Sequence, residues 1–173
     1  MAVKKKQFEI EIPLLNTVTA VPAFNLAALD GKTIKLDLTR MLKGKSIEAI
    51  FTVKVEGEKA IAVPKKLNLM FFYIRRMIRK NISYVEDSFV CSCTDGRLRI
   101  KTFMITRKRV HKSVRKALRE KARQDLIDFC KEKTKEDFLN AVIGNTIQKE
   151  LAARLKKIYP LALCEIRAVI PGK

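Results

Sequence analysis

The residues with the clearest chemical potential form one dense basic segment in the second half of the chain. Between Arg107 and Arg123 the sequence has nine lysines or arginines, one histidine and a single acid, Glu120. The segment joins the end of an expected strand to the start of an expected helix, where the helix dipole is already positive. An anion bound there would meet cationic side chains and the free N–H groups of the first helical turn. The segment therefore favours phosphate binding over a solvated basic face.

Further basic residues occur at the N-terminus, between residues 65 and 80, in the strand before the basic segment, and after residue 155. Arginine prevails where structure is expected, which suits two-point contact with phosphate. The lysine tail is explained equally well as a solubilising end. The candidate nucleic-acid contacts are Lys4, Lys5, Lys6, Lys65, Lys66, Arg75, Arg76, Arg79, Lys80, Arg97, Arg99, Arg107, Lys108, Arg109, His111, Lys112, Arg115, Lys116, Arg119, Arg123, Lys156 and Lys157.

The aromatic residues do not interleave with the basic runs. We expect Phe71, Phe72, Phe89 and Phe103 to pack in the core or within a hairpin. Stacking of unpaired bases on aromatic rings is therefore not favoured, and recognition of the nucleic-acid backbone or shape is expected instead.

The net charge restricts the partners of the protein. There are 37 lysines and arginines against 18 acidic residues, a formal charge of +19. A folded chain with this excess repels itself unless a polyanion neutralises it. Nucleic acid fits because neutralised phosphates release condensed counterions. On charge alone, an anionic membrane is the competing partner.

Other features of the sequence argue against the membrane. The longest apolar run, Leu69–Ile74, is far shorter than the ~20 residues that span a bilayer. The basic N-terminus is not followed by the apolar segment of a signal peptide. Ala2 stands where myristoylation needs glycine, and the sequence does not finish with a prenylation cysteine. We expect a cytoplasmic protein without a membrane partner.

The four cysteines are expected to be free thiols in that compartment. Cys91 and Cys93 are two residues apart, while Cys130 and Cys164 stand alone. Zinc sites usually combine close pairs of ligands, which this spacing does not supply. We expect Cys91 and Cys93 to share one face of a strand and to pack as small apolar residues. The sequence thus predicts no metal and no other cofactor.

Catalytic chemistry finds little support. Gly44-Lys45-Ser46 lacks the preceding glycine of a phosphate-binding loop. His111 is the single imidazole, and no nucleophile is marked beside it. Glu9 and Glu11 alternate with apolar residues, which indicates the solvent face of a strand. We therefore predict that the protein is not an enzyme.

Hydrophobic periodicity predicts the elements that position these residues. Alternating apolar residues indicate strands, and spacings of three and four indicate amphipathic helices. Thr94-Asp95-Gly96 predicts the tightest hairpin turn, Thr134 with Asp137 resembles a capping box, and Asn145 suits a further cap. The expected strands cover residues 8–12, 33–38, 47–55, 60–63, 84–93, 97–106 and 161–170. The expected helices cover residues 67–80, 110–131, 134–143 and 145–159.

This order of elements favours one α+β domain with a largely antiparallel sheet and packed amphipathic helices. The expected domain covers residues 8–173, after a basic tail at residues 1–7. The stretch around Pro22 is expected to be a loop.

Several motifs in the second half of the chain are similar to those of one ribosomal-protein family. Lys156-Lys-Ile-Tyr-Pro-Leu161 followed by Glu165-Ile-Arg167 resembles the ending of the small-subunit family called S-one-e, or S-three-a-e, of archaea and eukaryotes. The turn Thr94-Asp-Gly96 with Phe103 and Ile105-Thr-Arg-Lys-Arg109 is similar to another segment of that family.

The resemblance extends to weaker motifs and has departures. Val142-Ile-Gly144 resembles the family's helix junction, and Val53-Lys-Val-Glu-Gly-Glu-Lys59 resembles its hairpin turn. Gln7-Phe8 stands where the family usually has Trp-Tyr, and Lys66-Leu-Asn-Leu69 replaces an L-T-R-D-like motif. The likeness covers most of the chain and is strongest after residue 47.

The resemblance implies a structural constituent of the small ribosomal subunit, on its platform near the mRNA exit and the rRNA 3′ end. It implies contacts with small-subunit rRNA and neighbouring ribosomal proteins, with mRNA and initiation factors as further candidate partners. The implied fold is α+β with a strongly curved antiparallel sheet, a partial barrel.

Two other hypotheses remain open from the sequence. One is a free-standing nucleic-acid-binding protein of chromatin or mRNA, which the basic clusters would serve equally well. The other is a small metal-dependent nuclease, because such sites can be built from scattered carboxylates.

Overall fold

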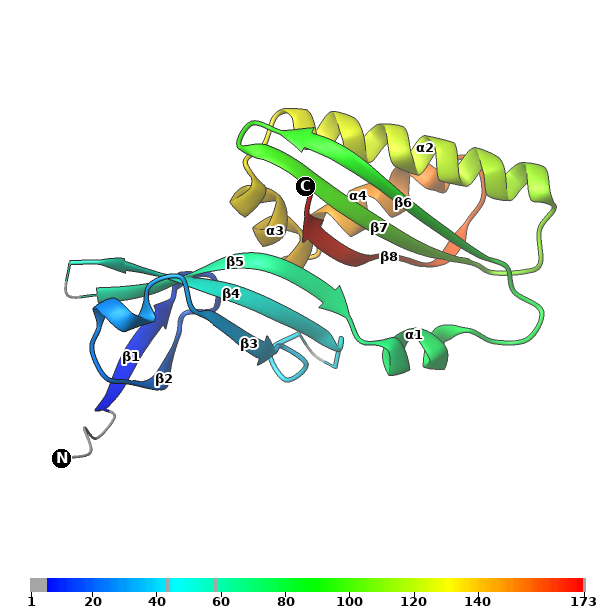
Figure 1. Cartoon of the computed structure of the whole chain (residues 1–173). Helices are drawn as coiled ribbons and strands as arrows, with labels where there is room; N and C mark the ends of the chain where they lie inside the picture. Colours follow the sequence, from blue (N-terminus) through cyan, green and yellow to red (C-terminus); the bar gives the residue numbers. More distant parts are fainter. Residues whose placement is uncertain (1–5, 43, 58, 173) are drawn as a thin grey trace.

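This computed structural model describes residues 6–42, 44–57 and 59–172 (Figure 1). Within them, alternating apolar residues form eight strands and residues of helical periodicity form four α-helices. The strands are β1 (Lys6–Ile12), β2 (Thr17–Ala23), β3 (Thr33–Asp37), β4 (Ile47–Glu56), β5 (Lys59–Leu69), β6 (Tyr84–Cys93), β7 (Gly96–Thr106) and β8 (Leu161–Pro171). The helices are α1 (Phe71–Met77), α2 (Lys112–Lys131), α3 (Lys135–Ile143) and α4 (Thr146–Leu155).

The strands form one open, curved sheet with the order β2-β1-β5-β8-β7-β6, and β4 pairs with both β5 and β3. All pairings are antiparallel except the short parallel one between β1 and β5. β5 and β8 pair only at Leu67 with Val169 and at Asn68 with Ala168, and this junction joins the N-terminal strands to the β6–β8 part. The expected α+β class and the largely antiparallel, curved sheet are confirmed.

The hairpin of β6 and β7 is the clearest success of the sequence patterns. Its register runs from Tyr84 opposite Ile105 to Cys93 opposite Gly96. Val85, Cys91 and Cys93 are buried on one face of β6, as alternation predicted. Gly96 closes the turn with φ of +130°, a conformation that suits a residue without a Cβ atom.

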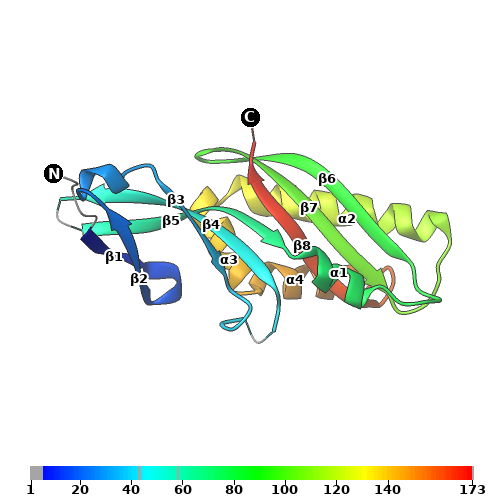
Figure 2. The same ribbon diagram turned by 60° about the horizontal axis from the view of Figure 1, so that its bottom comes forward.

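Helices α2 and α4 pack on β6 and β8, and α3 packs against α4 and β5, so the three helices cover one face of the sheet (Figure 2). Leu118, Ala122 and Leu126 recur every four residues of α2 and form its buried stripe. Thr134 caps α3 by accepting a 3.1 Å hydrogen bond from the backbone N–H of Asp137, which confirms the expected N-cap. Among the described residues, no helix is both long and apolar enough to cross a membrane.

The helix expected over residues 67–80 is wrong at both ends, because β5 continues through Leu69, α1 begins only at Phe71, and it ends at Met77. Leu67 and Leu69 are buried two residues apart, opposite Ala49 and Ile47 of β4. Leu67 fits the helical spacing with Met70 and Phe71, but it also alternates with Leu69 as strand residues do. Pairing with β4 and β8 decided in favour of the strand, a long-range effect that a local window does not contain.

The N-terminal region also contains more strand than expected. The stretch around Pro22 is not a loop but part of β2, which pairs antiparallel with β1. β2 lies at the edge of the sheet, where proline's missing N–H is tolerated. β1 begins at Lys6, so Lys6 and Gln7 of the expected tail lie in the first strand. Lys4 and Lys5 lie outside the described residues.

Candidate nucleic-acid interface

The first half of α2 presents a basic surface to solvent. Its residues are exposed and recur at three- and four-residue spacings, which places them on one side of the helix. The first turn of α2 contains no acidic residue that could complement the helix dipole. Together with Arg109 and His111, which directly precede the helix, we call this set the α2 basic surface; it consists of Arg109, His111, Lys112, Arg115, Lys116 and Arg119.

Arg115 and Arg119 lie at the centre of the α2 basic surface. Both line a hollow along the helix with Lys112 and Lys116, and both line a second hollow with Arg109 of the preceding loop. Arg119 also borders a third hollow that reaches the β6–β7 hairpin and includes Arg99, Lys101 and Arg167. The acids that also line these hollows, Glu86, Asp87 and Glu120, are paired with Arg167, Arg123 and Lys116. The hollows share lining residues and together expose several arginines that could bind the oxygen atoms of a polyanion.

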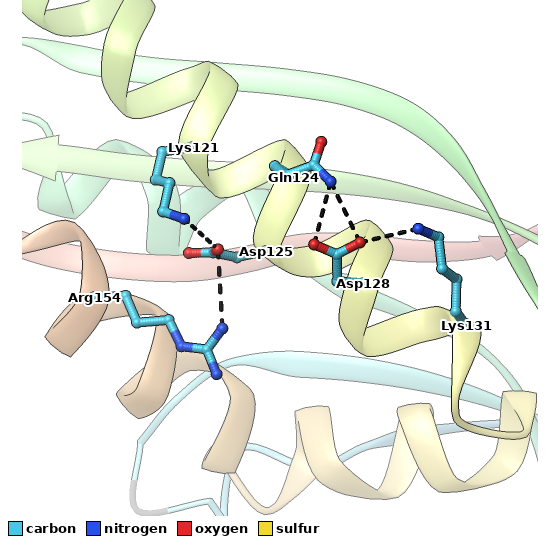
Figure 3. Close-up of polar contacts among 6 residues, drawn as sticks. All are labelled: Lys121, Gln124, Asp125, Asp128, Lys131 and Arg154. Atoms are coloured by element: carbon cyan, nitrogen blue, oxygen red, sulfur yellow. Dashed lines mark hydrogen bonds and ion pairs between the residues drawn. The ribbon is translucent and has the colours of Figure 1, made fainter.

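The second half of α2 has a different electrostatic character. There the Asp125 carboxylate forms ion pairs with Lys121 at 2.9 Å and with Arg154 of α4 at 3.8 Å (Figure 3). One turn further on, Asp128 accepts from Lys131 at 3.0 Å and from Gln124 at 3.1 Å. The cations of this half have intramolecular acids, whereas the first half has a single acid, Glu120, which lies 3.7 Å from Lys116. The excess positive charge of α2 is therefore concentrated in its first half.

Arg123 separates the two halves and has an intramolecular partner of its own. Its Nε and Nη2 atoms donate to the two carboxylate oxygens of Asp87 on β6, at 2.9 and 2.8 Å. These bonds raise the pKa of the Arg123 guanidinium above its usual value. The guanidinium carbon also lies 5.8 Å from the ring centre of Phe89. Arg123, expected as an RNA contact, thus anchors α2 to the edge strand of the sheet.

The structure brings separate basic clusters of the sequence to one end of the β6–β8 sheet. Thr106 pairs with Leu161, which places Arg107–Arg109 beside the segment that follows α4. Lys156 and Lys157 lie in that segment and are exposed. The backbone N–H of Thr106 donates to Ser83, which brings the chain after Arg79 and Lys80 to the same end.

Other predicted contacts lie elsewhere. Lys65 and Lys66 are on β5, where Lys65 is the extra residue of a β-bulge opposite Ile50 and Phe51 of β4. Lys6 begins β1. Arg97 and Arg99 are exposed on β7, towards the turn of the hairpin. The basic residues therefore do not form one site, and the α2 basic surface with the adjoining sheet end is their densest grouping.

The expectation that Phe71 and Phe72 are packed inside is wrong. Their exposed fractions are 57% and 59%, because the short α1 buries Tyr73 and Ile74 instead. The Arg75 guanidinium lies 4.6 Å from the centre of the Phe71 ring. Aromatic and cationic side chains are thus interleaved on α1, an arrangement that single-stranded nucleic acids can use. The sequence signal was the adjacency of Phe71-Phe72 to Arg75-Arg76.

Three of the cysteines meet between β6 and α2. Cys91 and Cys93 share the buried face of β6 as expected, and Cys130 approaches them from the last turn of α2. The three sulfur atoms all lie within 4.8 Å of one another. Sequence spacing could not reveal this grouping, because Cys130 is 39 residues from Cys91. Cys164 is buried on β8, and burial raises its pKa to about 12.

The carboxylates considered for catalysis face solvent. Glu9 and Glu11 are exposed on β1, while Ile10 and Ile12 between and after them are buried. His111 is exposed at the N-cap position of α2, among arginines and lysines. Neither observation assembles an acid–base pair of the kind that a hydrolytic site needs.

Comparisons with known proteins give family-level matches over nearly the whole chain. The model of the Ribosomal S3Ae family matches residues 3–170. Small ribosomal subunit protein eS1 of Nanoarchaeum equitans is 27% identical over 172 residues, which is 95% of this chain and 87% of that protein. The protein of the same name from Desulfurococcus amylolyticus is 26% identical over 170 residues, 94% of this chain and 80% of the relative. The one from Pyrobaculum aerophilum is 30% identical over 154 residues, 86% and 70% of the two chains.

Proposed function

The chain belongs to the ribosomal S3Ae family, and on that premise we propose that it is a structural constituent of the small ribosomal subunit that binds rRNA through the α2 basic surface. Membership of a ribosomal-protein family supports a structural role in translation, in the cytoplasm, and not an enzymatic one. The relatives are named as small-subunit proteins, which favours small-subunit rRNA as the partner over chromatin or free mRNA.

The observation that carries the proposal is the central position of Arg115 and Arg119. Each side chain borders more than one hollow, and the acids of the second half of α2, Asp125 and Asp128, are paired there with other side chains. A guanidinium can donate two parallel hydrogen bonds to phosphate oxygens, which a solvated lysine does less specifically. Backbone phosphates of a folded RNA would therefore be bound by shape and charge rather than by base sequence.

The sheet end next to the α2 basic surface extends the proposed contact. Arg107–Arg109 and Lys156 project from adjacent segments there, so an RNA helix crossing this end would meet both. Phe71 and Phe72 offer a second mode of contact, in which unpaired bases stack on α1 while Arg75 pairs with phosphate.

The position within the subunit rests on the family resemblance. We place the protein on the platform, near the mRNA exit and the rRNA 3′ end, with neighbouring ribosomal proteins beside it. Contacts with mRNA and with initiation factors are part of the same proposal and need the assembled particle for a test.

The test is RNA binding by the double variant Arg115→Ala/Arg119→Ala. Its matched control is Lys54→Ala/Lys149→Ala, which removes two exposed positive charges from β4 and α4. Filter binding to the small-subunit rRNA should weaken at least ~10-fold for the first variant. The dependence of log affinity on log salt should fall by about 0.7–0.9 for each lost phosphate contact.

The control variant should show a small loss of affinity. Equal losses in both variants would mean that net charge, not the α2 basic surface, holds the RNA. Equal affinity of the unaltered protein for bulk DNA and for the rRNA would favour a free-standing nucleic-acid-binding protein instead.

A further inference from the structure

The grouping of Cys91, Cys93 and Cys130 has a geometry that the packing of small apolar residues does not require. Their exposed fractions are 3%, 8% and 0%, and the Cys91 and Cys130 sulfur atoms are 3.1 Å apart. Three of the four thiols in the chain therefore point at one place, although they come from two separate elements. Alanine or valine would fill such a space without this convergence of sulfur atoms.

The separations suit simultaneous binding of one ion. Zinc–sulfur bonds are about 2.3 Å long, so three thiolates on one zinc ion lie about 4 Å apart. The three sulfur atoms here, all within 4.8 Å of one another, would reach that arrangement by small side-chain movements. Cys91 and Cys93 contribute from one face of β6, and Cys130 contributes from the opposite direction on α2, so the ion would lie between them.

The surroundings also provide a compensating positive charge. A divalent ion with three thiolates has a net charge of −1, and a monovalent ion has −2. Lys135 acts electrostatically on Cys93. Its ammonium lies over Gly96 at the hairpin turn, where a Cβ atom would be 2.6 Å from the nitrogen. A side chain at Gly96 would require this lysine to shift.

We propose that Cys91, Cys93 and Cys130 form a three-thiolate site for one soft metal ion, zinc(II) or copper(I). Soft thiolate ligands select ions of this class. Three sulfur donors complete a three-coordinate copper(I) site, whereas zinc would take one further, exchangeable ligand. Each thiol releases a proton as it binds, so the full reaction converts three thiols and one ion into the complex and three protons. The bound ion would tie the last turn of α2 to the hairpin.

The experiment titrates Zn(II) and Cu(I) separately into the full chain, reduced and freed of metal under anaerobic conditions. The proposal expects one equivalent of at least one ion to bind and the unfolding midpoint to rise. Calorimetry in two buffers of different ionisation enthalpy should show that protons are released on binding. Copper(I) would also give an ultraviolet thiolate-to-metal absorption band, which distinguishes the two ions.

The variant Cys130→Ala should lower the affinity at least ~100-fold. Cys93→Ala, at the most exposed of the three thiols, serves as a second variant if Cys130→Ala does not fold. The matched control Cys164→Ala removes a buried thiol outside the cluster and should bind as the unaltered chain does.

Three results would overturn the proposal. The first is the failure of both ions to bind at one equivalent. The second is an equal loss of affinity in Cys164→Ala and the cluster variants. The third is a disulfide bond between Cys91 and Cys130 in freshly isolated protein, seen as an intact mass lower by two hydrogens and as a linked peptide that contains both residues. None of these results depends on RNA binding.

Discussion

Arg123 of α2 and Asp87 of β6 form a two-point ion pair, with Nε 2.9 Å from Oδ2 and Nη2 2.8 Å from Oδ1. The Asp87 side chain is 8% exposed, whereas the Arg123 side chain is 46% exposed. The pair fixes α2 against the edge strand directly beside the α2 basic surface. It also separates one arginine that holds the fold together from the arginines, one and two turns earlier, that are available to a partner.

Replacing Arg123 should therefore affect mainly stability, whereas replacing Arg119 should affect mainly RNA binding. Arg123→Ala leaves the Asp87 carboxylate without its guanidinium, and we expect a loss of about 1–2 kcal/mol in the free energy of unfolding. Arg119→Ala should change that free energy by less than ~0.5 kcal/mol, as is usual for exposed residues, but should weaken rRNA binding. Urea unfolding and filter binding of both variants measure the contrast. Reversed effects would assign the RNA contact to Arg123.

The buried ion pair between Lys45 and Glu165 makes stability depend on pH in a specific way. The Lys45 ammonium nitrogen lies 2.5 Å from a carboxylate oxygen of Glu165 and also donates to Asn145 Oδ1 at 3.2 Å. Asn145 is the N-cap residue of α4, as expected, but its side chain makes no capping hydrogen bond. Burial raises the pKa of Glu165, and Lys45 partly offsets the rise. Because the folded state holds this proton more tightly, the contribution of Glu165 is most favourable at low pH and declines as pH rises through the raised pKa.

Lys45→Met should magnify that decline. Without the ammonium, the pKa of Glu165 should rise further, so the stability lost by the variant should be small near pH 4 and reach about 3 kcal/mol near pH 7. In Lys45→Met/Glu165→Gln, the difference between the two pH values should largely disappear. Chemical unfolding at both pH values provides the measurement. A loss independent of pH in the single variant would indicate that Lys45 acts through packing alone.

The exposed rings of α1 should contribute to binding of unpaired RNA. Phe71→Ala/Phe72→Ala should lower affinity for single-stranded RNA at least ~10-fold, since stacking of one base contributes about 1–3 kcal/mol. The slope of log affinity against log salt should not change, because no cation is removed. Val90→Ala, a similarly exposed apolar residue on β6, is the control. Unaltered affinity with reduced stability would mean that the rings pack against protein instead.

Elements whose signals are local could be predicted from the sequence. The hairpin of β6 and β7 follows from alternation around Thr94-Asp95-Gly96, and the start of α3 follows from Thr134 and Asp137. The dense positive charge of early α2 was also visible, since it needs only the order of residues and a helical period.

Relationships between distant segments could not be predicted in this way. Leu67–Leu69 satisfies both periods, and only pairing with β4 and β8 decides between them. The partners Asp87 and Arg123 are 36 residues apart, and Cys130 joins Cys91 across 39 residues. The exposure of Phe71 and Phe72 follows from where α1 begins, so the error in that boundary also misplaced the two rings.

The central claim is that the α2 basic surface contacts small-subunit rRNA in the assembled particle. Ultraviolet cross-linking of purified small subunits, followed by mass spectrometry of the nucleotide-bearing peptides, tests it most directly. We predict that the protein sediments with the small subunit and that cross-links concentrate between Arg109 and Arg119. Recovery of the protein only in the free fraction, or cross-links confined to β1–β3, would contradict the claim.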